Sequence, residues 1–277
     1  MKPITLLIAL LALGWLAYLA WEARCAAKAR ASLAHVVHVN GTRGKSTVSR
    51  LANGLLLPTS GKVLLDGADT RTTRTSAIAR KVGFLFQNPD RQICQNTVRE
   101  ELAFGLKVQG VPEEEVKART EEALRDFSLD GDWFPFTRSR GERQRIALAS
   151  VLICRPKMVI LDEPTTGLDY KECIAIMDYI TRLNRETGLT VLMVSHDMEL
   201  VQQYAKRVLV LTNGQLQGDG PVNEIMKDLS ILEKAHVRPA QIPALALRFG
   251  DRFKDVYTVD EMAAALKAAA KKGGAPA

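Results

Sequence analysis

Short apolar runs alternate with amphipathic segments along most of the chain. The apolar runs predict strands at residues 35–39, 62–65, 81–86, 158–161, 189–194 and 207–212. The amphipathic segments predict helices at residues 45–56, 112–127 and 170–187. Asn213-Gly214 separates two strand-like runs and predicts a hairpin turn. Because strands alternate with helices, the pattern predicts an α/β fold with a mainly parallel sheet.

The first segment departs from this alternation. Residues 3–21 carry no charged side chain and approach the length that a helix needs to cross a hydrocarbon core of roughly 30 Å. Arg24, Lys28 and Arg30 follow this segment and outnumber the one lysine before it. We therefore expect a single transmembrane helix in the cell membrane, with the rest of the chain on the cytoplasmic side. The alternative is a cleaved secretory signal, with small residues near Ala29.

From residue 226 the pattern changes again. Pro239, Pro243 and Gly250 separate short helical pieces, and the run from Thr258 to Glu261 is a capping box that opens an alanine-rich helix. We therefore predict a membrane anchor with its basic flank at 1–31, the α/β domain at 32–225 and a helical C-terminal extension at 226–277.

Composition narrows the class of protein. The chain has 277 residues, of which 47% are hydrophobic, and its mean hydropathy of −0.04 excludes a polytopic membrane protein. The formal charge of +7 suits a phosphate-bearing ligand or an anionic membrane surface. The basic residues are dispersed rather than interleaved with aromatic ones, so we expect no nucleic-acid partner.

One loop predicts phosphate binding. It lies between the strand expected at 35–39 and the helix that follows, where backbone N–H groups and the helix start can hold phosphates. Lys45 is expected to reach the β- and γ-phosphates, and the Ser46 hydroxyl to bind Mg²⁺. Val39 stands where the standard pattern has a glycine. The candidate nucleotide-binding residues are Gly41, Thr42, Arg43, Gly44, Lys45, Ser46 and Thr47.

Two acids supply the matching chemistry. The apolar run 158–161 ends in Asp162 and Glu163. In such an arrangement the first carboxylate holds Mg²⁺ and the second, in a drier position, activates water. Together with the phosphate loop, this pair predicts a nucleotide hydrolase.

Further motifs add a family resemblance. They occur in one order along the chain: residues 87–90 (QNPD), 139–145, 161–169 (LDEPTTGLD) and 195–197 (SHD). From about Ser46 onward the chain resembles the ATP-binding cassette ATPases. Residues 87–92 and 97–105 resemble more narrowly the energy-coupling-factor ATPases, which drive uptake of vitamins and transition-metal ions. The resemblance implies a P-loop NTPase fold with a helical subdomain that carries the signature segment.

The resemblance also implies roles, with ATP and Mg²⁺ as cofactors. Gln87 corresponds to the residue that contacts Mg²⁺ or the attacking water, and Glu163 to the general base. His196 corresponds to the histidine that contacts the γ-phosphate, and Asp169 to a carboxylate that communicates across a dimer. The implied metal ligands are Ser46, Gln87 and Asp162.

Partners follow from the same resemblance. In this family two ATPase domains, identical or different, enclose ATP between them and drive transmembrane transporter subunits. Each domain offers its signature segment to the nucleotide held by the other. Here Ser139 and Gly141 belong to that segment.

The sequence departs from the family at three places, the third of which is the N-terminal stretch. The signature reads Arg138-Ser139-Arg140-Gly141-Glu142, so that Arg140 replaces a glycine that allows close backbone approach to phosphate. No aromatic residue between the predicted membrane segment and the phosphate loop is available to stack on adenine. We therefore expect weaker nucleotide binding and a less effective signature.

Residues 1–50 carry a different resemblance. The membrane segment followed by residues 41–46 is similar to the start of the poly-γ-glutamate synthase ligase, a relative of the Mur ligases. Three functions therefore stay open. The first is an ATPase that energises import of a vitamin or a transition-metal ion. The others are an ATP-dependent amide ligase and a degenerate nucleotide-binding partner in an ATPase heterodimer.

Overall fold

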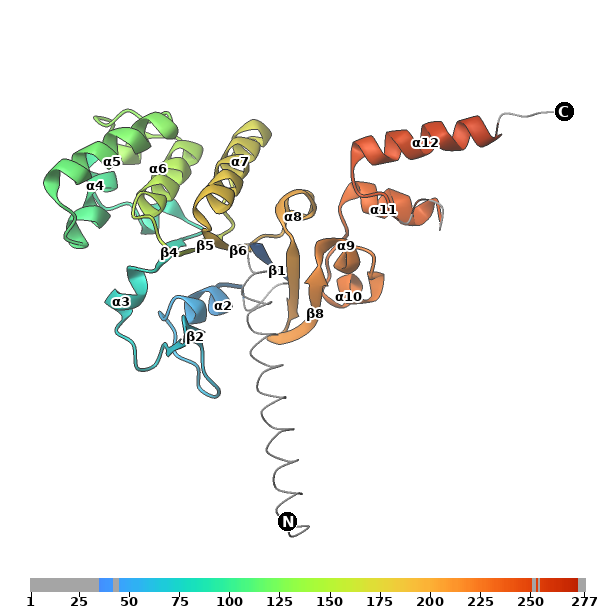
Figure 1. Cartoon of the computed structure of the whole chain (residues 1–277), viewed down its shortest axis with the longest axis horizontal. Helices are drawn as coiled ribbons and strands as arrows, with labels where there is room; N and C mark the ends of the chain where they lie inside the picture. The colour runs from blue at the N-terminus through green and yellow to red at the C-terminus, as the bar shows by residue number, and fades with distance from the viewer. Residues whose placement is uncertain (1–34, 42–44, 251–252, 254, 274–277) are drawn as a thin grey trace, which may run out of the picture. The chain divides into compact units, whose positions relative to one another are not determined.

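A six-stranded sheet organises the chain in this computed structural model (Figure 1). The structure describes residues 35–41, 45–250, 253 and 255–273. Across the sheet the strands are β4 (Val82–Leu85), β5 (Met158–Asp162), β6 (Thr190–Val194), β1 (His35–Gly41), β7 (Arg207–Thr212) and β8 (Gln215–Pro221). Every neighbouring pair is parallel except β7 and β8. The predicted mainly parallel sheet is therefore confirmed.

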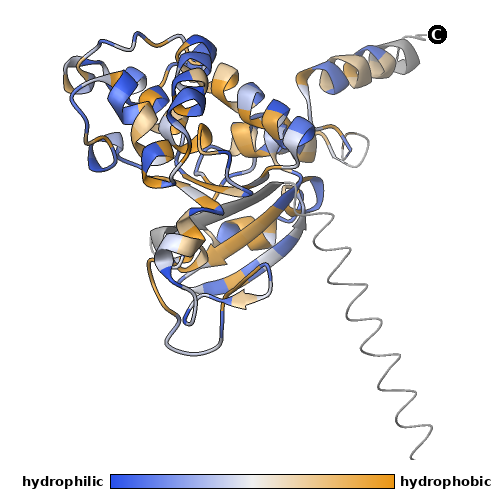
Figure 2. Cartoon of the chain, turned by 60° about the vertical axis from the view of Figure 1, so that its left-hand side comes forward, coloured by the Kyte–Doolittle hydropathy of each residue, from blue (hydrophilic) through white to orange (hydrophobic). Residues whose placement is uncertain are grey.

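The strands are apolar because helices cover the sheet. Val159, Ile160 and Leu161 of β5 are all fully buried, as expected for a strand with both faces covered. Figure 2 shows hydrophobic residues along the strands. The β7–β8 hairpin turns at Asn213 and Gly214, whose φ angles of 51° and 78° are both positive. A two-residue turn of this type requires positive φ at both positions, so the predicted hairpin is confirmed.

Three helices form a layer between β4 and β5 in the sequence. They are α4 (Val98–Val108), α5 (Glu113–Asp126) and α6 (Arg140–Leu152), and they lie together in Figure 1. Leu102, Leu106, Ile146 and Leu148 are fully buried in this layer. The short 3₁₀ turns η1 (Pro89–Arg91) and η2 (Pro135–Thr137) connect the layer to its neighbours. This layer matches the predicted helical subdomain.

The remaining helices connect or follow the strands. The connecting elements are α2 (Lys45–Ala52), β2 (Leu64–Leu65), β3 (Ala68–Asp69), α3 (Thr75–Ala79), α7 (Tyr170–Thr187) and α8 (Met198–Tyr204). After β8 come α9 (Val222–Ile225), α10 (Leu229–Lys234), α11 (Gln241–Arg248) and α12 (Val259–Gly273). The last two helices share a small apolar cluster, and the capping box at Thr258 and Glu261 is confirmed.

Three expectations differ from the structure or lie beyond it. Helix α2 ends at Ala52 rather than at residue 56, because Asn53 and Gly54 form a turn in which Gly54 has a φ of +73°. Strand β2 is shorter than predicted. The predicted membrane segment, residues 3–21, lies outside the described residues. Within the described ranges, no helix is both long and apolar enough to cross a membrane.

Candidate functional site

The topology brings four strand ends to one edge of the sheet. Leu85 pairs with Leu161, Asp162 with Val194, and Val194 with His38. The segments that follow β4, β5, β6 and β1 therefore leave the sheet side by side. We call this side the carboxyl edge. In parallel α/β sheets, ligands bind at this edge.

The phosphate loop follows β1, between β6 and β7 in the sheet. Residues 42–44 lie outside the described part of the chain. Lys45 and Ser46 are the first two residues of α2, and Gly41 is the last residue of β1. The loop therefore joins a central strand to a helix N-terminus, as the sequence predicts.

Glu163 is the most closely held side chain at this edge. The residue is 8% exposed and has a φ of 51°, and its N–H donates to the Val194 carbonyl at 2.9 Å. Its Oε2 accepts a hydrogen bond from Gln87 Nε2 at 2.8 Å and another from Thr166 Oγ1 at 3.3 Å. The structure thus brings Gln87 and Glu163 together, 76 residues apart in the chain.

His196 approaches the same carboxylate from the end of β6. Its Nδ1 lies 3.1 Å from Glu163 Oε1, while its side chain is 65% exposed. The other ring nitrogen is left to meet a ligand. Two predicted residues, Gln87 and His196, therefore contact one buried acid from separate loops.

Asp162 ends β5 and is 5% exposed. It pairs in register with Val194 and precedes Glu163, so two buried carboxylates lie next to each other in the chain. Burial disfavours a charged carboxylate unless hydrogen bonds or a cation compensate. Adjacent buried acids beside a phosphate loop are suited to hold a hard divalent cation through oxygen atoms.

The signature residues lie at the start of α6. Ser139 is the N-cap, its Oγ accepting the Glu142 N–H at 3.2 Å, while its own N–H donates to Glu142 at 2.8 Å. The Ser139 N–H is the main reason that the pKa of Glu142 is lowered. Gly141 is buried: a Cβ there would lie 3.1 Å from Glu172 Oε2. These contacts place the N-terminus of α6 beside the first turn of α7.

The two signature arginines behave differently. The guanidinium of Arg138 lies over the Trp133 ring at 5.0 Å from its centroid and is close to Thr137. Arg140 is exposed, and its stem packs on Gly167, where a Cβ would lie 2.7 Å from Arg140 Cδ. The added side chain at 140 therefore rests on the loop that follows Glu163.

Asp169 has a structural role that the family resemblance does not state. It is the N-cap of α7, where its Oδ1 accepts the Glu172 N–H at 2.8 Å.

Thr47, another predicted nucleotide-binding residue, is an exposed residue of α2.

Sequence reasoning missed several side chains that support the site. Thr166 donates to Glu163, and Gln144 Nε2 donates to the Pro164 carbonyl at 3.2 Å. Asp90 and Arg143 form an ion pair with Nε and Oδ1 2.7 Å apart. Of these contacts, only that of Thr166 could have been expected from the local sequence, because its hydroxyl follows Glu163 by three residues. The contacts of Gln144 and Arg143 join segments that are distant in the chain and meet only in the folded protein.

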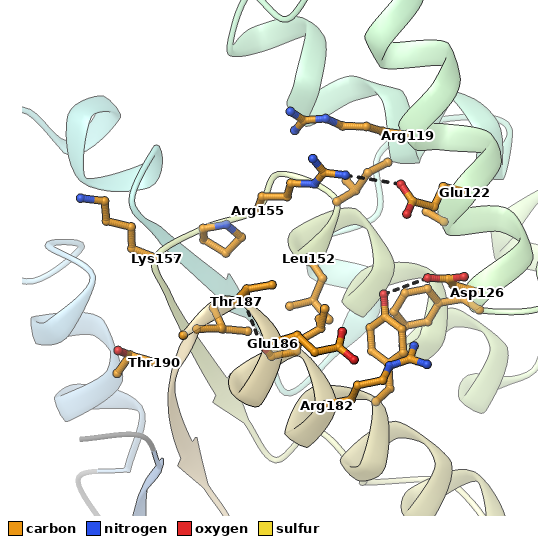
Figure 3. Close-up of a pocket in the computed structure, with 18 of the residues that line it drawn as sticks. Arg119, Glu122, Asp126, Leu152, Arg155, Lys157, Arg182, Glu186, Thr187 and Thr190 are labelled. Atoms are coloured by element: carbon orange, nitrogen blue, oxygen red, sulfur yellow. Dashed lines mark hydrogen bonds and ion pairs between the residues drawn. The ribbon is translucent and has the colours of Figure 1, made fainter. Parts of the chain in front are cut away.

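A large cavity lies at the opposite edge of the sheet (Figure 3). Its volume is about 840 Å³, and it is lined by residues that precede β5 and β6 together with parts of α5 and α7. Arg155 pairs with Glu122 across it at 3.5 Å, and Tyr179 donates to Asp126 at 3.3 Å. None of the predicted site residues that the structure describes lines this cavity. This cavity and the converging polar groups are therefore at different edges.

Comparison with known proteins decides the family. The ABC transporter family model matches residues 33–166. A putative ABC transporter ATP-binding protein of Pyrococcus abyssi is 40% identical over 233 residues, which cover 82% of this chain and 86% of the relative. The chain belongs to the ABC transporter ATP-binding proteins. The α/β P-loop fold and the cassette resemblance are thereby confirmed.

Other members of the ABC transporter family are also similar. The energy-coupling factor transporter ATP-binding protein EcfA of Methanothermobacter thermautotrophicus is 41% identical over 73% of this chain and 66% of its own length. The structure of cbiO1 from Clostridium perfringens, described as part of the ABC transporter complex cbiONQ, has a TM-score of 0.65 and 29% identity. That match covers 79% of this chain and 88% of cbiO1.

A dimeric ABC cassette structure in a post-hydrolysis state, bound to ADP and Pi, has a TM-score of 0.62 and 28% identity. The match covers 68% of this chain and 84% of the cassette chain. The chain spans 40, 37 and 39% of the length of three curated relatives, one from Caldanaerobacter subterraneus and two from Methanosarcina species.

The match to the ABC transporter family begins earlier than the sequence motifs suggest. It starts at residue 33 rather than near Ser46, and so includes β1 and the phosphate loop. The resemblance of residues 1–50 to a Mur-type ligase receives no support from these comparisons, since the loop on which it rested falls within the ABC match.

Proposed function

We propose that this ABC protein is the ATP-hydrolysing subunit of a membrane importer for a vitamin or a transition-metal ion. The observation that carries this proposal is the cluster at the carboxyl edge, where Gln87, Thr166 and His196 all contact the buried Glu163. The named relatives EcfA and cbiO1 favour an energy-coupling-factor type of importer over other transport functions.

Phosphate binding is assigned to residues 41–47. Strand β1 delivers this loop to the carboxyl edge, and α2 begins directly after it. The start of a helix carries partial positive charge and free N–H groups, which favour phosphate oxygens. We assign Lys45 to the β- and γ-phosphates of ATP.

Asp162, Ser46 and Gln87 are the proposed ligands of Mg²⁺. The donor set fits, because Asp162 is a buried carboxylate at the end of β5 and hard cations prefer oxygen ligands. When bound, Mg²⁺ neutralises charge on the phosphates. Asp162 and the Gln87 amide oxygen would orient it from the strand ends.

Glu163 is the proposed general base. Its carboxylate accepts a proton from a water molecule, and the resulting hydroxide oxygen forms a bond to the γ-phosphorus as the bond to the β–γ bridging oxygen breaks. The Gln87 amide, which now donates to Glu163, orients that water. His196 donates to a γ-phosphate oxygen.

The partners are proposed from the solved structures that resemble this chain. We propose that a second ATPase subunit and transmembrane subunits complete the transporter, with Ser139, Gly141 and Asp169 facing the nucleotide or the second subunit. The cbiO1 structure belongs to a multi-subunit ABC complex, and the ADP-bound cassette is dimeric, which supports such an assembly. The membrane anchor at 1–31 remains a prediction.

One observation favours a second candidate function. The side chain of Arg140 adds bulk at the helix start that should approach phosphate, and it packs on Gly167. The chain could therefore bind nucleotide through its own loop while offering a poor signature to its partner. In that case it is the less active member of an ATPase heterodimer.

The proposal is tested by phosphate release from ATP by the full chain with Mg²⁺. We expect Glu163→Gln to lower the rate by about a hundredfold or more while a fluorescent ATP analogue still binds. Glu101→Gln is the matched control, since Glu101 is equally buried but accepts the Cys94 and Gln95 N–H groups instead.

Three outcomes distinguish the functions. Phosphate release that depends on Glu163 supports the importer ATPase. Binding without release, with release restored only after an intact second ABC subunit is mixed in, supports the heterodimer partner. Absence of saturable binding of the analogue would contradict both.

A further inference from the structure

The turn that carries His196 is fixed by side-chain hydrogen bonds on both of its sides. The Oγ of Ser195, a residue only 3% exposed, accepts the Asp197 N–H at 3.0 Å. Asp197 is the N-cap of α8, and its Oδ1 accepts the Glu199 and Leu200 N–H groups at 3.0 and 3.2 Å. His196 therefore lies on a short turn that continues directly into the first turn of α8, and a displacement of that helix start moves His196.

The side chain of Glu199 joins this helix start to a distant helix. Its Oε1 accepts the Gln241 N–H, the first of α11, at 2.7 Å. The N-cap of α11 is Ala240, which makes no side-chain hydrogen bond, and the first turn of α11 contains no acidic residue. A carboxylate at the first N–H groups of a helix stabilises the helix start. Glu199 thus caps α11 from 42 residues away in the chain.

Helix α11 connects two apolar clusters. Ala240, directly before it, is 1% exposed and belongs to the main core. Ala246, near its end, is 2% exposed and belongs to the small cluster that α11 shares with α12. We call α11 and α12 the terminal helix pair. The pair has a core of its own, and its junction with the main core lies at the start of α11, where Glu199 is bound.

A second attachment of the terminal helix pair lies elsewhere. Lys227, which follows α9, pairs with Asp255 in the segment between α11 and α12, with Nζ and Oδ1 2.7 Å apart. This ion pair does not involve α8. Of these two polar attachments, only the one through Glu199 therefore reaches the helix that begins beside His196.

We propose that Glu199 is a positioning residue through which the terminal helix pair holds His196 beside Glu163. The main-chain N–H of Glu199 is bound by the cap that follows His196, and its carboxylate is bound to α11. At the other end of this connection, His196 Nδ1 lies 3.1 Å from Glu163 Oε1. The importance of this placement for hydrolysis rests on the proposed function, whereas the placement itself is measurable without nucleotide.

Two variants break the same hydrogen bond from opposite sides. Glu199→Ala removes the acceptor, and Gln241→Pro removes the donor. Proline is tolerated at the first position of a helix, and the extended backbone of Ala240, with a ψ of 156°, is compatible with a following proline. Each variant therefore tests the bond without relying on the other substitution.

The placement of His196 is read from its ring C–H resonances by NMR in the full-length chain without nucleotide. The chain has four histidines, and the spectrum of His196→Gln assigns the resonances of interest. We expect Glu199→Ala and Gln241→Pro to shift these resonances in the same direction. The double variant should shift them no further than either single variant, because both remove one interaction.

One variant restores the contact and two serve as controls. Glu199→Gln keeps an oxygen that accepts the Gln241 N–H, so it should leave the His196 resonances near their parent positions. Lys227→Met breaks the other attachment of the terminal helix pair, and Glu261→Ala removes the carboxylate that caps α12. The interactions lost in these controls do not involve α8, so both should leave the His196 resonances unchanged.

Phosphate release gives an independent readout. We expect Glu199→Ala and Gln241→Pro to lower kcat by about two- to fivefold, the size expected for one exposed hydrogen bond, with an unchanged KM for ATP. Glu199→Gln should release phosphate at close to the parent rate. A raised KM with an unchanged kcat would contradict the proposal, because it would place the role of Glu199 in nucleotide binding.

The two inferences fail separately. If the parent chain neither binds nucleotide nor releases phosphate, the proposed function fails, while the His196 resonances still decide the role of Glu199. If the parent chain releases phosphate but neither Glu199→Ala nor Gln241→Pro moves those resonances, the role of Glu199 is refuted and the proposed function stands. Equal shifts in the Lys227 and Glu261 controls would also refute it, since they would indicate general loosening.

Discussion

The two edges of the sheet differ in how far their charged side chains are exposed to solvent. At the carboxyl edge, Asp162 and Glu163 are 5% and 8% exposed, and three polar side chains converge on Glu163. The cavity at the opposite edge is lined by charged side chains that are open to solvent, such as Arg155 at 63% and Glu122 at 56%. Exposed pairs of this kind contribute little free energy, about 0–1 kcal/mol.

Helix polarity reinforces the difference. Helices α2, α7 and α8 begin at the carboxyl edge, after β1, β5 and β6, so their positive ends favour an anion there. At the other edge α7 ends at Gly188, beside the cavity. Topology and burial locate the chemistry, whereas cavity volume does not.

The largest expected effect is at Asp162. Asp162→Asn keeps the shape of the side chain but removes the charge that we assign to Mg²⁺. Charge stabilisation by such an ion is worth several kcal/mol, so Mg²⁺-dependent phosphate release should fall by about a hundredfold or more. Asp126→Asn changes a carboxylate at the cavity and should alter release by less than about twofold. Equal losses in both variants would remove the distinction between the edges.

A smaller effect is expected from Gln87→Ala. It removes the 2.8 Å hydrogen bond to Glu163, and hydrogen bonds to charged groups contribute about 1.5–3 kcal/mol. Phosphate release should fall by about tenfold at saturating ATP. Gln109→Ala removes an amide side chain at the C-terminal end of α4 and serves as the control. A Gln87 variant with the parent rate would exclude Gln87 from the reaction.

The sequence predicts those parts of the fold that depend on local spacing. The bounds of α7 are predicted to the residue, because an aspartate cap, an amphipathic run and Gly188 mark its start, face and end. The turn at Asn213 and the strand ending in Asp162 are equally local. Helix α2 is predicted too long, since the apolar residues after Gly54 continue the pattern although the backbone has already turned.

The same distinction holds for the site: local sequence predicts which residues belong to it but not which contacts they make. Sequence motifs identify Gln87, Glu163 and His196. The motifs do not predict that Gln87 and His196 contact different carboxylate oxygens of Glu163, because this contact depends on how strands β4, β5 and β6 align. The contact between Asp90 and Arg143 joins an exposed residue to a mostly buried one, and neither shows a periodic signal. No spacing rule predicts it, because the partners meet only after η1 packs on α6.

Unlike the variants above, Arg140→Gly should raise the rate of phosphate release. Removing the side chain frees the helix start and Gly167, and steric displacement of about 1 Å can cost about a hundredfold in rate. With a second ATPase subunit present, phosphate release should rise several-fold. Stability should fall slightly, because glycine is the poorer helix residue. Arg138→Leu is the control, since Arg138 folds onto Trp133. No gain in Arg140→Gly would show that the arginine is not the obstacle.

The smallest expected effect is at the cavity edge and concerns stability rather than turnover. Burial raises the pKa of Tyr179 to about 12, with Asp126 as a further cause, so the folded state favours the protonated phenol. The resulting stabilisation is complete below pH 10, the ordinary pKa of tyrosine, and is lost as the pH rises through about 12.

Tyr179→Phe removes this titration together with the hydrogen bond to Asp126. Because Tyr179 is only half-buried, we expect the variant to be less stable by about 1 kcal/mol at pH 8 in urea unfolding, with unchanged phosphate release. The difference between the two proteins should shrink between pH 10 and 12, since only the parent loses stability by ionising Tyr179. A constant difference over that range would mean that the phenol titrates alike in both states, and a change in phosphate release would mean that the two edges are coupled.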